Sequence, residues 1–527
     1  MVTFHNVQFL TVLLFRFACL SLSQDAAHWN KVARDDLERA LELETVNKNT
    51  AKNVIVFLGD GMGVPTITSA RIYKGQLDGQ SGEETSLTFE SLPRTALIKN
   101  YNTDQQVPDS SGTATAILTG VKTKHGVVGV DDSVITGDCS SGKTAEVDSV
   151  FDIAIREGKA AGIVTTTRIT HASPASVYAH AADRDWELAA EDDCVDIAAQ
   201  LVARAADFQV VLGGGRRAFL TTEMVDPEDN STYGEREDGR DLISEWKDNV
   251  PDGMNGHYVW NKTEFDAIDP EKTDYLFGLF EWNHMNYEAN RADDKAGEPS
   301  LLEMTEKAIK MLSKNEKGFF LFVEGGRIDH AHHFNWAYGA LNDAVMFDSA
   351  VEKALGMVDT DEDTLLIVTA DHSHVNTISG YPKRGNPILG KTGELADDGL
   401  PYTTLNYANG PLAPRVQESF QQTGDRPNIT DVDTESRDYQ QDALIAFEME
   451  THGGEDVTVH ADGPYAHLFH NFHEQNYIAH VIKYAACIGE YAGRCIVEDV
   501  SSASREAVSQ IASLVTMCVA LLFNIRL

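Results

Sequence analysis

NVIVFLGDG, residues 53–61, holds five consecutive apolar residues and then a Gly-Asp-Gly turn. Four more apolar runs, three of them also followed by polar turns, lie at residues 161–167, 208–215, 318–326 and 364–371. Unbroken apolar character, without alternation, is typical of strands that are covered on both faces. Stretches with helical spacing of apolar residues lie between the runs, at 146–159 and 301–315. This rhythm predicts an α/β fold, a three-layer sandwich with a large, mostly parallel central sheet flanked by helices.

Residues that can bind metals follow four of these runs. They are Asp60 after the first run, His171 and Ser173 after the second, Glu324, Asp329 and His333 around the end of the fourth, and Asp371 and His372 after the last. Because ligands bind at the carboxyl ends of strands in open α/β sheets, we expect these side chains to meet at one edge. Any one of them alone is as readily a helix cap or a core histidine, but four strand ends together favour a metal centre.

The residue types indicate which metals such a centre would hold. Clustered carboxylates repel one another unless divalent cations lie among them. Mixed aspartate and histidine ligands suit zinc, whereas all-oxygen sets suit magnesium. Asp329 and His333 are four residues apart, so one helical turn puts both on the same face. His452, in ETHGGEDV (450–457), is a candidate further ligand.

Ser110 is a second candidate for chemistry, in VPDSSGTATA (107–116). The small residues that follow it are typical of a tightly packed helix start. One interpretation is structural, with Ser110 or Asp109 as the N-cap. The other is a nucleophile at a helix N-terminus, where free N–H groups favour an anionic phosphoryl group. A serine near a metal needs no histidine base.

Composition excludes one class of partner. The 527 residues contain 43 Lys and Arg against 82 Asp and Glu, a formal net charge of −39. This balance argues against nucleic acid as a partner, because phosphate backbones attract an excess of basic residues. Hydrophobic residues make up 42%, enough for a large core.

The two ends of the chain predict export and anchoring. Residues 1–23 form an apolar stretch that ends in Ser-Leu-Ser and fits a secretory signal peptide; a buried helix is the alternative. Residues 511–523 are uncharged but shorter than the roughly 20 residues of a membrane span. With Ser501 and Ser502 as attachment candidates, residues 501–527 predict a GPI-anchor signal that is removed, although a terminal helix docked on the core is the alternative. The predicted location is the extracellular face of the plasma membrane.

Cysteines and sequons agree with export. Four of the six cysteines, Cys139, Cys194, Cys487 and Cys495, lie between the two terminal segments. Four cysteines allow three pairings, and we predict Cys139–Cys194 and Cys487–Cys495 because short separations are the easiest to close. Glycosylation candidates are Asn230, Asn261 and Asn428, each in an Asn-x-Thr sequon.

Six motifs occur in order: FLGDGMG (57–63), VPDSSGTATA (107–116), TTTRITHASPA (165–175), VEGGRIDHAHH (323–333), TADHSH (369–374) and ETHGGEDV (450–457). With them the chain resembles the alkaline phosphatases, specifically their animal, membrane-anchored branch, over about residues 29–495. The resemblance implies a homodimer that acts on phosphate monoesters at alkaline pH. The sequence itself predicts a signal peptide (1–23), a helical arm (24–46), a catalytic core (47–379), an inserted subdomain (380–450), core completion (451–500) and an anchor signal (501–527). Residues 380–450 are rich in Gly, Pro, Asn and Asp and interrupt the βα rhythm, and the resemblance implies that this insertion is crown-like.

Carried over by motif, the resemblance implies specific roles for individual residues. Ser110 matches the nucleophile that becomes phosphoserine, and Arg184 the clamp for phosphate. Asp329, His333 and His452 match the ligands of a first zinc, Asp60, Asp371 and His372 those of a second, and Asp60, Ser173 and Glu324 those of a magnesium. His171 and His330 match histidines behind these ligands. A calcium site is implied at Glu228, Phe280 (through its carbonyl), Glu281 and Glu298.

The sequence departs from the family pattern at two positions beside the implied catalytic residues. Ser111 stands where alanine is usual, and Asp183 where asparagine is frequent, which puts rate and substrate preference in doubt. Two rival functions remain at this point: another enzyme of the superfamily, such as a phosphodiesterase or sulfatase, and a catalytically inactive, GPI-anchored adhesion or calcium-binding protein. Intact ligands argue against the second rival, because buried acids without a purpose are costly.

Overall fold

The computed structural model describes residues 46–191 and 193–494, together with Lys31 and Arg34. The chain divides into two units, Met1–Val46 and Asn47–Leu527. Of the first unit the structure describes only Lys31, Arg34 and Val46, and the first two are helical. The predicted signal segment, the rest of the predicted arm, Cys495, and the segment 501–527 with Ser501 and Ser502 lie outside the described residues.

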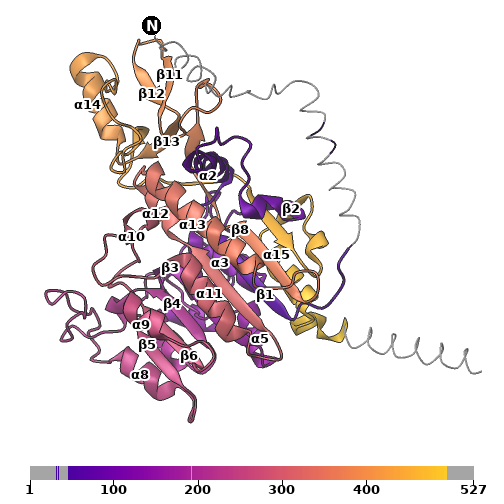
Figure 1. The fold of residues 1–527 in the computed structure, drawn as a ribbon. Helices are drawn as coiled ribbons and strands as arrows, with labels where there is room; N and C mark the ends of the chain where they lie inside the picture. The colour runs from indigo at the N-terminus through magenta and orange to yellow at the C-terminus, as the bar shows by residue number, and fades with distance from the viewer. Residues whose placement is uncertain (1–30, 32–33, 35–45, 192, 495–527) are drawn as a thin grey trace, which may run out of the picture. The chain divides into compact units, whose positions relative to one another are not determined.

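A ten-stranded sheet forms the centre of the second unit (Figure 1). Its strands lie in the order β17 (Phe472–Glu474), β2 (Arg94–Lys99), β16 (Val457–Asp462), β8 (Thr364–Ala370), β1 (Asn53–Gly59), β7 (Phe319–Gly325), β3 (Ala160–Arg168), β4 (Val210–Gly214), β6 (Tyr275–Leu279) and β5 (Gly256–Val259). Within this sheet only β16 runs antiparallel to its neighbours. All five predicted apolar runs form strands here, so the predicted α/β fold is confirmed.

Helices cover both faces of this sheet, as the alternation of side chains along β7 demonstrates. Phe320 packs edge-on against Phe151 of α5 (Val150–Arg156), with ring centroids 5.9 Å apart. Gly325 faces Phe347 of α13 (Ala337–Leu355). Because positions 320 and 325 are an odd number of residues apart, their side chains lie on opposite faces. The helix 301–315 expected from the sequence is α11 (Leu301–Leu312), and it packs beside α13.

The remaining helices complete these layers and the loops between them. They are α2 (Val64–Leu77), α3 (Ser110–Thr119), α4 (Cys139–Ala145), α6 (Ala172–Ala175), α7 (Ile197–Ala203), α8 (Leu242–Asn249), α9 (Lys262–Ala267), α10 (Glu288–Arg291), α12 (Arg327–His333) and α15 (Tyr477–Ala486). The predicted helix at 146–159 is shorter than expected, since Ser149 caps α5 at its start and the chain turns after Arg156.

The segment predicted as an insertion has small sheets of its own. One contains β10 (Asn376–Ile378), β13 (Leu405–Gly410) and β14 (Ala443–Ala446); the other pairs β11 (Lys391–Leu395) with β12 (Pro401–Thr403). Helix α14 (Ala413–Thr423) lies beside β14. The sheets explain why residues 380–450 interrupt the βα rhythm, whereas the exact domain boundaries stay a prediction.

The cysteine and sequon predictions have separate outcomes. Cys139 and Cys194 form a disulfide, with Cα atoms 5.6 Å apart, as predicted. Cys487 is also disulfide-bonded, and its predicted partner Cys495 is outside the described residues. Asn230 and Asn428 are exposed, whereas Asn261 caps α9; glycosylation of all three stays a prediction. In the described part of the chain, no helix is long and apolar enough to cross a membrane.

Candidate metal centre and active site

The register of three central strands brings the predicted ligands together. Gly59 of β1 pairs with Gly325 of β7 and with Ala370 of β8. Asp60 and Asp371 therefore leave neighbouring strands at the same level, and Glu324 lies on the strand at the other side of β1. The predicted convergence at the carboxyl edge of the sheet is observed.

One cluster lies between α12 and a two-stranded β-ladder whose strands precede and follow the insertion in sequence. Within α12, His333 Nε2 lies 3.2 Å from Asp329 Oδ2. His452 in β15 (His452–Gly453) pairs with His374 in β9 (Ser373–His374), which carries it back across the insertion. Its Nε2 lies 3.3 Å from Asp329 Oδ1 and 3.2 Å from His333 Nε2. The two imidazole nitrogens thus face each other, and each faces one of the two Asp329 carboxylate oxygens, so the structure brings together the three residues that the sequence groups.

A second cluster contains Asp60, Asp371 and His372. All three are fully buried, and their ligand atoms lie within 4.8 Å of one another. His372 Nε2 lies 3.4 Å from Asp60 Oδ1 and 3.3 Å from Asp371 Oδ2. One imidazole nitrogen therefore points between two carboxylates.

The third cluster is rich in oxygen. Asp60 and Glu324 gather with His171, and Ser173 lies at the start of the adjacent α6. Asp60 Oδ2, Glu324 Oε1 and Ser173 Oγ are buried and have no hydrogen-bond partner among the described residues. Buried oxygens without partners are costly unless something else satisfies them, and a cation does so.

Ser110 lies at the first position of α3, directly beside the second cluster. The N-cap of this helix is Asp109, whose side chain accepts hydrogen bonds from Ser111 and Gly112 N–H groups. Ser110 is therefore not the cap, and its side chain remains available. Its Oγ lies 3.1 Å from His372 Nε2 and 3.3 Å from Asp60 Oδ1.

Arg184 faces the same space from the loop that follows α6. Its Nη1 donates to Asp109 Oδ2 over 3.1 Å, and its Nη2 lies 3.1 Å from His171 Nε2. The ring of His330 lies behind His171, with centroids 5.2 Å apart. Burial lowers the pKa of both histidines well below the usual range, with nearby arginines adding to the effect, so both imidazoles are neutral.

The charges of the clusters are not balanced by basic side chains. Among the described residues, no lysine or arginine forms an ion pair with Asp60, Glu324, Asp329, Asp371 or Glu450. Burial and the neighbouring carboxylates Asp371 and Asp329 raise the pKa of Asp60 well above its usual range. Burial likewise raises the pKa of Glu324 to about 7, against hydrogen bonds from Thr165 and Thr167. This donor set therefore fits divalent cations, which would supply the missing positive charge.

Three further residues contribute to the site without having been assigned from the sequence. His374 Nε2 contacts Asp329 Oδ1 over 2.7 Å, and its Nδ1 contacts Glu450 Oε2 over 2.5 Å. Although burial opposes a charge, Glu450 and Asp329 raise the pKa of His374 to about 10. The ring of His284 packs at a tilt against that of His330, with centroids 4.2 Å apart. His374 lies in the motif TADHSH and Glu450 in the motif ETHGGEDV, so these two could have been found from the motifs. Nothing in the sequence indicated His284.

The predicted calcium residues meet only in part. Carboxylates of Glu228, Glu281 and Asp294 lie within 4.8 Å of one another, and Phe280 precedes Glu281 after β6. Glu298 instead accepts the backbone N–H of Asn286, over 3.0 Å. Burial and Glu228 raise the pKa of Glu281 to about 8, although Arg216 opposes this. Asp294 was not predicted, and its role as a ligand, like that of Glu298, is untested.

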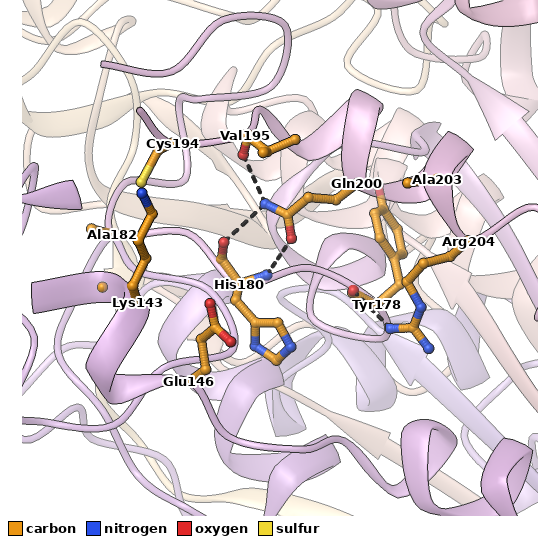
Figure 2. Close-up of a pocket in the computed structure, with 11 residues that line it drawn as sticks. Lys143, Glu146, Tyr178, His180, Ala182, Cys194, Val195, Gln200, Ala203 and Arg204 are labelled. Carbon is orange, nitrogen blue, oxygen red and sulfur yellow. Dashed lines mark hydrogen bonds between the residues drawn. The ribbon is translucent and has the colours of Figure 1, made fainter. Parts of the chain in front are cut away.

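A separate cavity of about 380 Å³ lies beside the disulfide (Figure 2). Tyr178, His180, Gln200 and Arg204 line it, and Gln200 hydrogen-bonds both the N–H and the carbonyl of His180. None of the candidate metal clusters in the described residues lies in this lining. The candidate metal clusters and this cavity are therefore separate features of the molecule.

The fold and the clustered carboxylates and histidines at its sheet edge are those of an α/β protein with candidate metal sites. The sequence matches the alkaline phosphatase family over residues 51–488. It is 49% identical over 483 residues to the tissue-nonspecific alkaline phosphatase of Rattus norvegicus, covering 90% of each chain. It is 48% identical over 473 residues to the alkaline phosphatase of Gadus morhua, covering 88% of this chain and 97% of that one. The chain belongs to the alkaline phosphatase family and is a phosphomonoester hydrolase.

Solved structures agree on the fold. The alkaline phosphatase of Thermus thermophilus superposes with a TM-score of 0.60 at 23% identity, covering 86% of this chain and 94% of that one. The enzyme of the Antarctic bacterium TAB5 gives a TM-score of 0.57 at 24% identity, covering 84% and 100%. At these identities the likeness supports the architecture alone.

Proposed function

We propose that this chain hydrolyses phosphate monoesters through a phosphoserine formed on Ser110, with two zinc ions and one magnesium ion per subunit. One observation carries the proposal: Ser110 Oγ lies within 3.3 Å of both His372 Nε2 and Asp60 Oδ1, at the start of α3. A hydroxyl held between metal-ligating groups, at the positive end of a helix, is placed to attack an anionic phosphoryl group.

The residues divide into three metal sets. Asp329, His333 and His452 would hold the first zinc, Asp60, Asp371 and His372 the second, and Asp60, Ser173 and Glu324 the magnesium. The fit rests on donor chemistry, since mixed nitrogen and oxygen sets suit zinc and the orphaned oxygens of the third set suit magnesium. When bound, such ions supply Lewis-acid charge that activates hydroxyls and neutralises attacking and leaving oxygens.

The protein's own groups position the reaction. Ser110 supplies the attacking oxygen, which forms the bond to phosphorus as the ester oxygen leaves, and water then releases phosphate from the serine. Arg184 presents N–H groups toward the non-bridging oxygens, a task for which its planar fork is suited. Because His171 and His330 are neutral, Arg184 is the residue of this group that brings positive charge to the substrate.

Replacement of the nucleophile tests the covalent step. Ser110→Ala removes the attacking oxygen, so turnover of p-nitrophenyl phosphate falls by at least about a thousandfold while zinc and magnesium content stays near that of the parent. Ser69→Ala, which truncates a fully buried serine of α2, is the control and keeps its activity. Rates near those of the parent in Ser110→Ala exclude the phosphoserine.

A substrate series tests the specificity. Rates on p-nitrophenyl phosphate, on a nitrophenyl phosphodiester and on nitrophenyl sulfate should fall steeply in that order. Arg184 and the third metal set favour a substrate whose non-bridging oxygens carry two charges, and a diester has one fewer. Equal rates on the diester would assign the chain to diester hydrolysis.

The proposal extends to assembly, location and a calcium ion. The protein would act as a homodimer at the outer face of the plasma membrane, held by a GPI anchor, and Glu228, Glu281 and the Phe280 carbonyl would hold calcium with Glu298 or Asp294. Phosphatidylinositol-specific phospholipase C should release the activity from intact cells. Activity that stays with the membrane after this treatment contradicts the anchor.

A further inference from the structure

Ser111 shares one oxygen atom with the proposed phosphate clamp. Asp109 Oδ2 accepts a hydrogen bond from Ser111 Oγ over 2.5 Å and another from Arg184 Nη1 over 3.1 Å. Both Ser111 and Asp109 are buried, at 0% and 2% exposure, so water does not compete for this oxygen. The hydroxyl and the guanidinium therefore draw on the same charge.

The orientation of Asp109 does not depend on this hydroxyl. Asp109 Oδ1 accepts the N–H of Gly112 over 3.2 Å, and Oδ2 accepts the N–H of Ser111 over 3.4 Å, as an N-cap does. The Asp109 N–H in turn donates to Asn102 Oδ1 over 2.9 Å. The carboxylate stays in place when the hydroxyl is removed, so the effect of the hydroxyl is mainly electrostatic.

Asp109 is the acid that contacts Arg184 directly, whereas Asp60 and Asp185 attract its charge only from further away. Among the described residues Asp109 is its only carboxylate partner within ion-pair distance, and its other side-chain contact is the His171 ring, 3.1 Å from its Nη2. The Arg184 side chain is 25% exposed, so it has room to move. A short hydrogen bond to a carboxylate oxygen is strong, and it lowers the charge available to a second donor on the same atom.

We propose that Ser111 is a positioning residue that weakens the hold of Asp109 on Arg184 and thereby lowers the affinity of the site for phosphate. The proposal rests on the proposed function, because it takes Arg184 as the residue that binds the phosphoryl group. A looser Arg184 binds the tetrahedral anion less tightly and releases the product phosphate sooner. The Ser111 hydroxyl thus lowers the affinity of the site for phosphate and speeds the release of product phosphate.

The test compares Ser111→Ala with the parent, using inorganic phosphate as the probe. The inhibition constant for phosphate and KM should both fall about three- to tenfold, while kcat falls or stays level, since part of one charge-assisted hydrogen bond passes to Arg184. Ser111→Thr, which restores the hydroxyl, should return the inhibition constant toward that of the parent. If its extra methyl group prevents folding, Ser111→Cys, of similar volume with a weak donor, should behave like Ser111→Ala.

A double-mutant cycle separates this effect from packing. In the Asp109→Asn background, Ser111→Ala should leave phosphate affinity unchanged, because the shared charge is gone. Phosphate binding measured by calorimetry on Ser110→Ala, with and without Ser111→Ala, gives the same comparison without turnover. This measurement can therefore be interpreted even if the reaction does not pass through a phosphoserine. An inhibition constant that is unchanged or higher in Ser111→Ala, or a change that persists with Asp109→Asn, overturns the proposal.

Discussion

Two regions of the molecule bury acidic side chains and balance them in opposite ways. In the sheet-edge centre, defined here as Asp60, Glu324, Asp329, Asp371 and Glu450, the partners are histidines and other acids. In the arginine-balanced region, Arg216 contacts Asp226 and Glu228 at 2.9 and 2.7 Å, and Arg236 contacts Asp196 at 3.0 Å. The second region balances its acids with arginines of its own, whereas the first has His374 beside Asp329 and Glu450 and no arginine or lysine ion pair among the described residues, so it needs further positive charge from bound cations. This difference, more than the number of acids, indicates where cations bind.

The largest effect should come from the sheet-edge centre. Asp60 belongs to two of the metal sets, so Asp60→Asn removes charge from both, and kcat/KM should fall by at least about a thousandfold together with bound zinc and magnesium. Metal analysis and a monoester assay at pH 9–10 measure both. Asp238→Asn, which removes a partly exposed partner of Arg236, serves as the control and should keep its metals. Full metal content in Asp60→Asn would contradict the contrast between the regions.

The arginine-balanced region should respond in stability and not in chemistry. Arg216→Met leaves Asp226 buried beside no cation, which should cost about 3–5 kcal/mol in the free energy of unfolding. Denaturant titration measures this, with Arg240→Met as the control, since its exposed pair with Glu245 contributes less than about 1 kcal/mol. The folded fraction of Arg216→Met should keep its zinc and its kcat. Loss of zinc from that fraction would show that the regions are not independent.

The sequence predicts the sheet-edge centre better than its surroundings, for a physical reason. Asp60, Glu324 and Asp371 follow or end buried parallel strands, and strand register alone brings them together. His374 and Glu450 lie in two of the motifs but received no role, because their contact depends on how β9 pairs with β15 across the insertion. His284 comes from a loop after β6, and no periodicity or motif indicates its ring contact with His330. Glu298 and Asp294 are four residues apart in the loop before α11, and the sequence prediction named Glu298 alone because nothing in the pattern indicated Asp294.

A buried acid can also remain protonated and therefore uncharged, and Asp343 is an example. Burial raises its pKa to about 8, although Arg327 opposes the shift. The unfolded chain ionises this group above about pH 4, so stability falls as pH rises from about 4 to 8 and the full penalty is present above 8. Asp343→Asn cannot ionise and still accepts the Glu288 N–H that Asp343 Oδ2 accepts over 3.1 Å.

The expected result is a gain in stability that grows with pH. Relative to the parent, Asp343→Asn should gain roughly 2 kcal/mol at pH 9 and much less at pH 5, less than the whole pKa shift implies because the buried amide hydrogens also need partners. Thermal unfolding at the two pH values measures the difference. A gain that is equal at both pH values would place the origin in packing and not in the proton.

The smallest change in stability should come from the cluster of Glu228, Glu281 and Asp294, whose charge is only partly balanced by an arginine. Arg216 balances Glu228, but the pKa of Glu281 is still raised to about 8, so one arginine is not enough for three acids. Calcium at ten times its Kd should therefore stabilise the parent by about 1.4 kcal/mol, and Glu281→Gln should lose this gain.

Asp294→Asn and Glu298→Gln form a matched pair: the first should lose the calcium response and the second keep it, because Glu298 is held by the Asn286 N–H. The reverse result would restore Glu298 as the ligand. A calcium response that survives in Glu281→Gln would mean that Arg216 balances this cluster as it balances its neighbours, and the contrast would then be confined to the sheet edge.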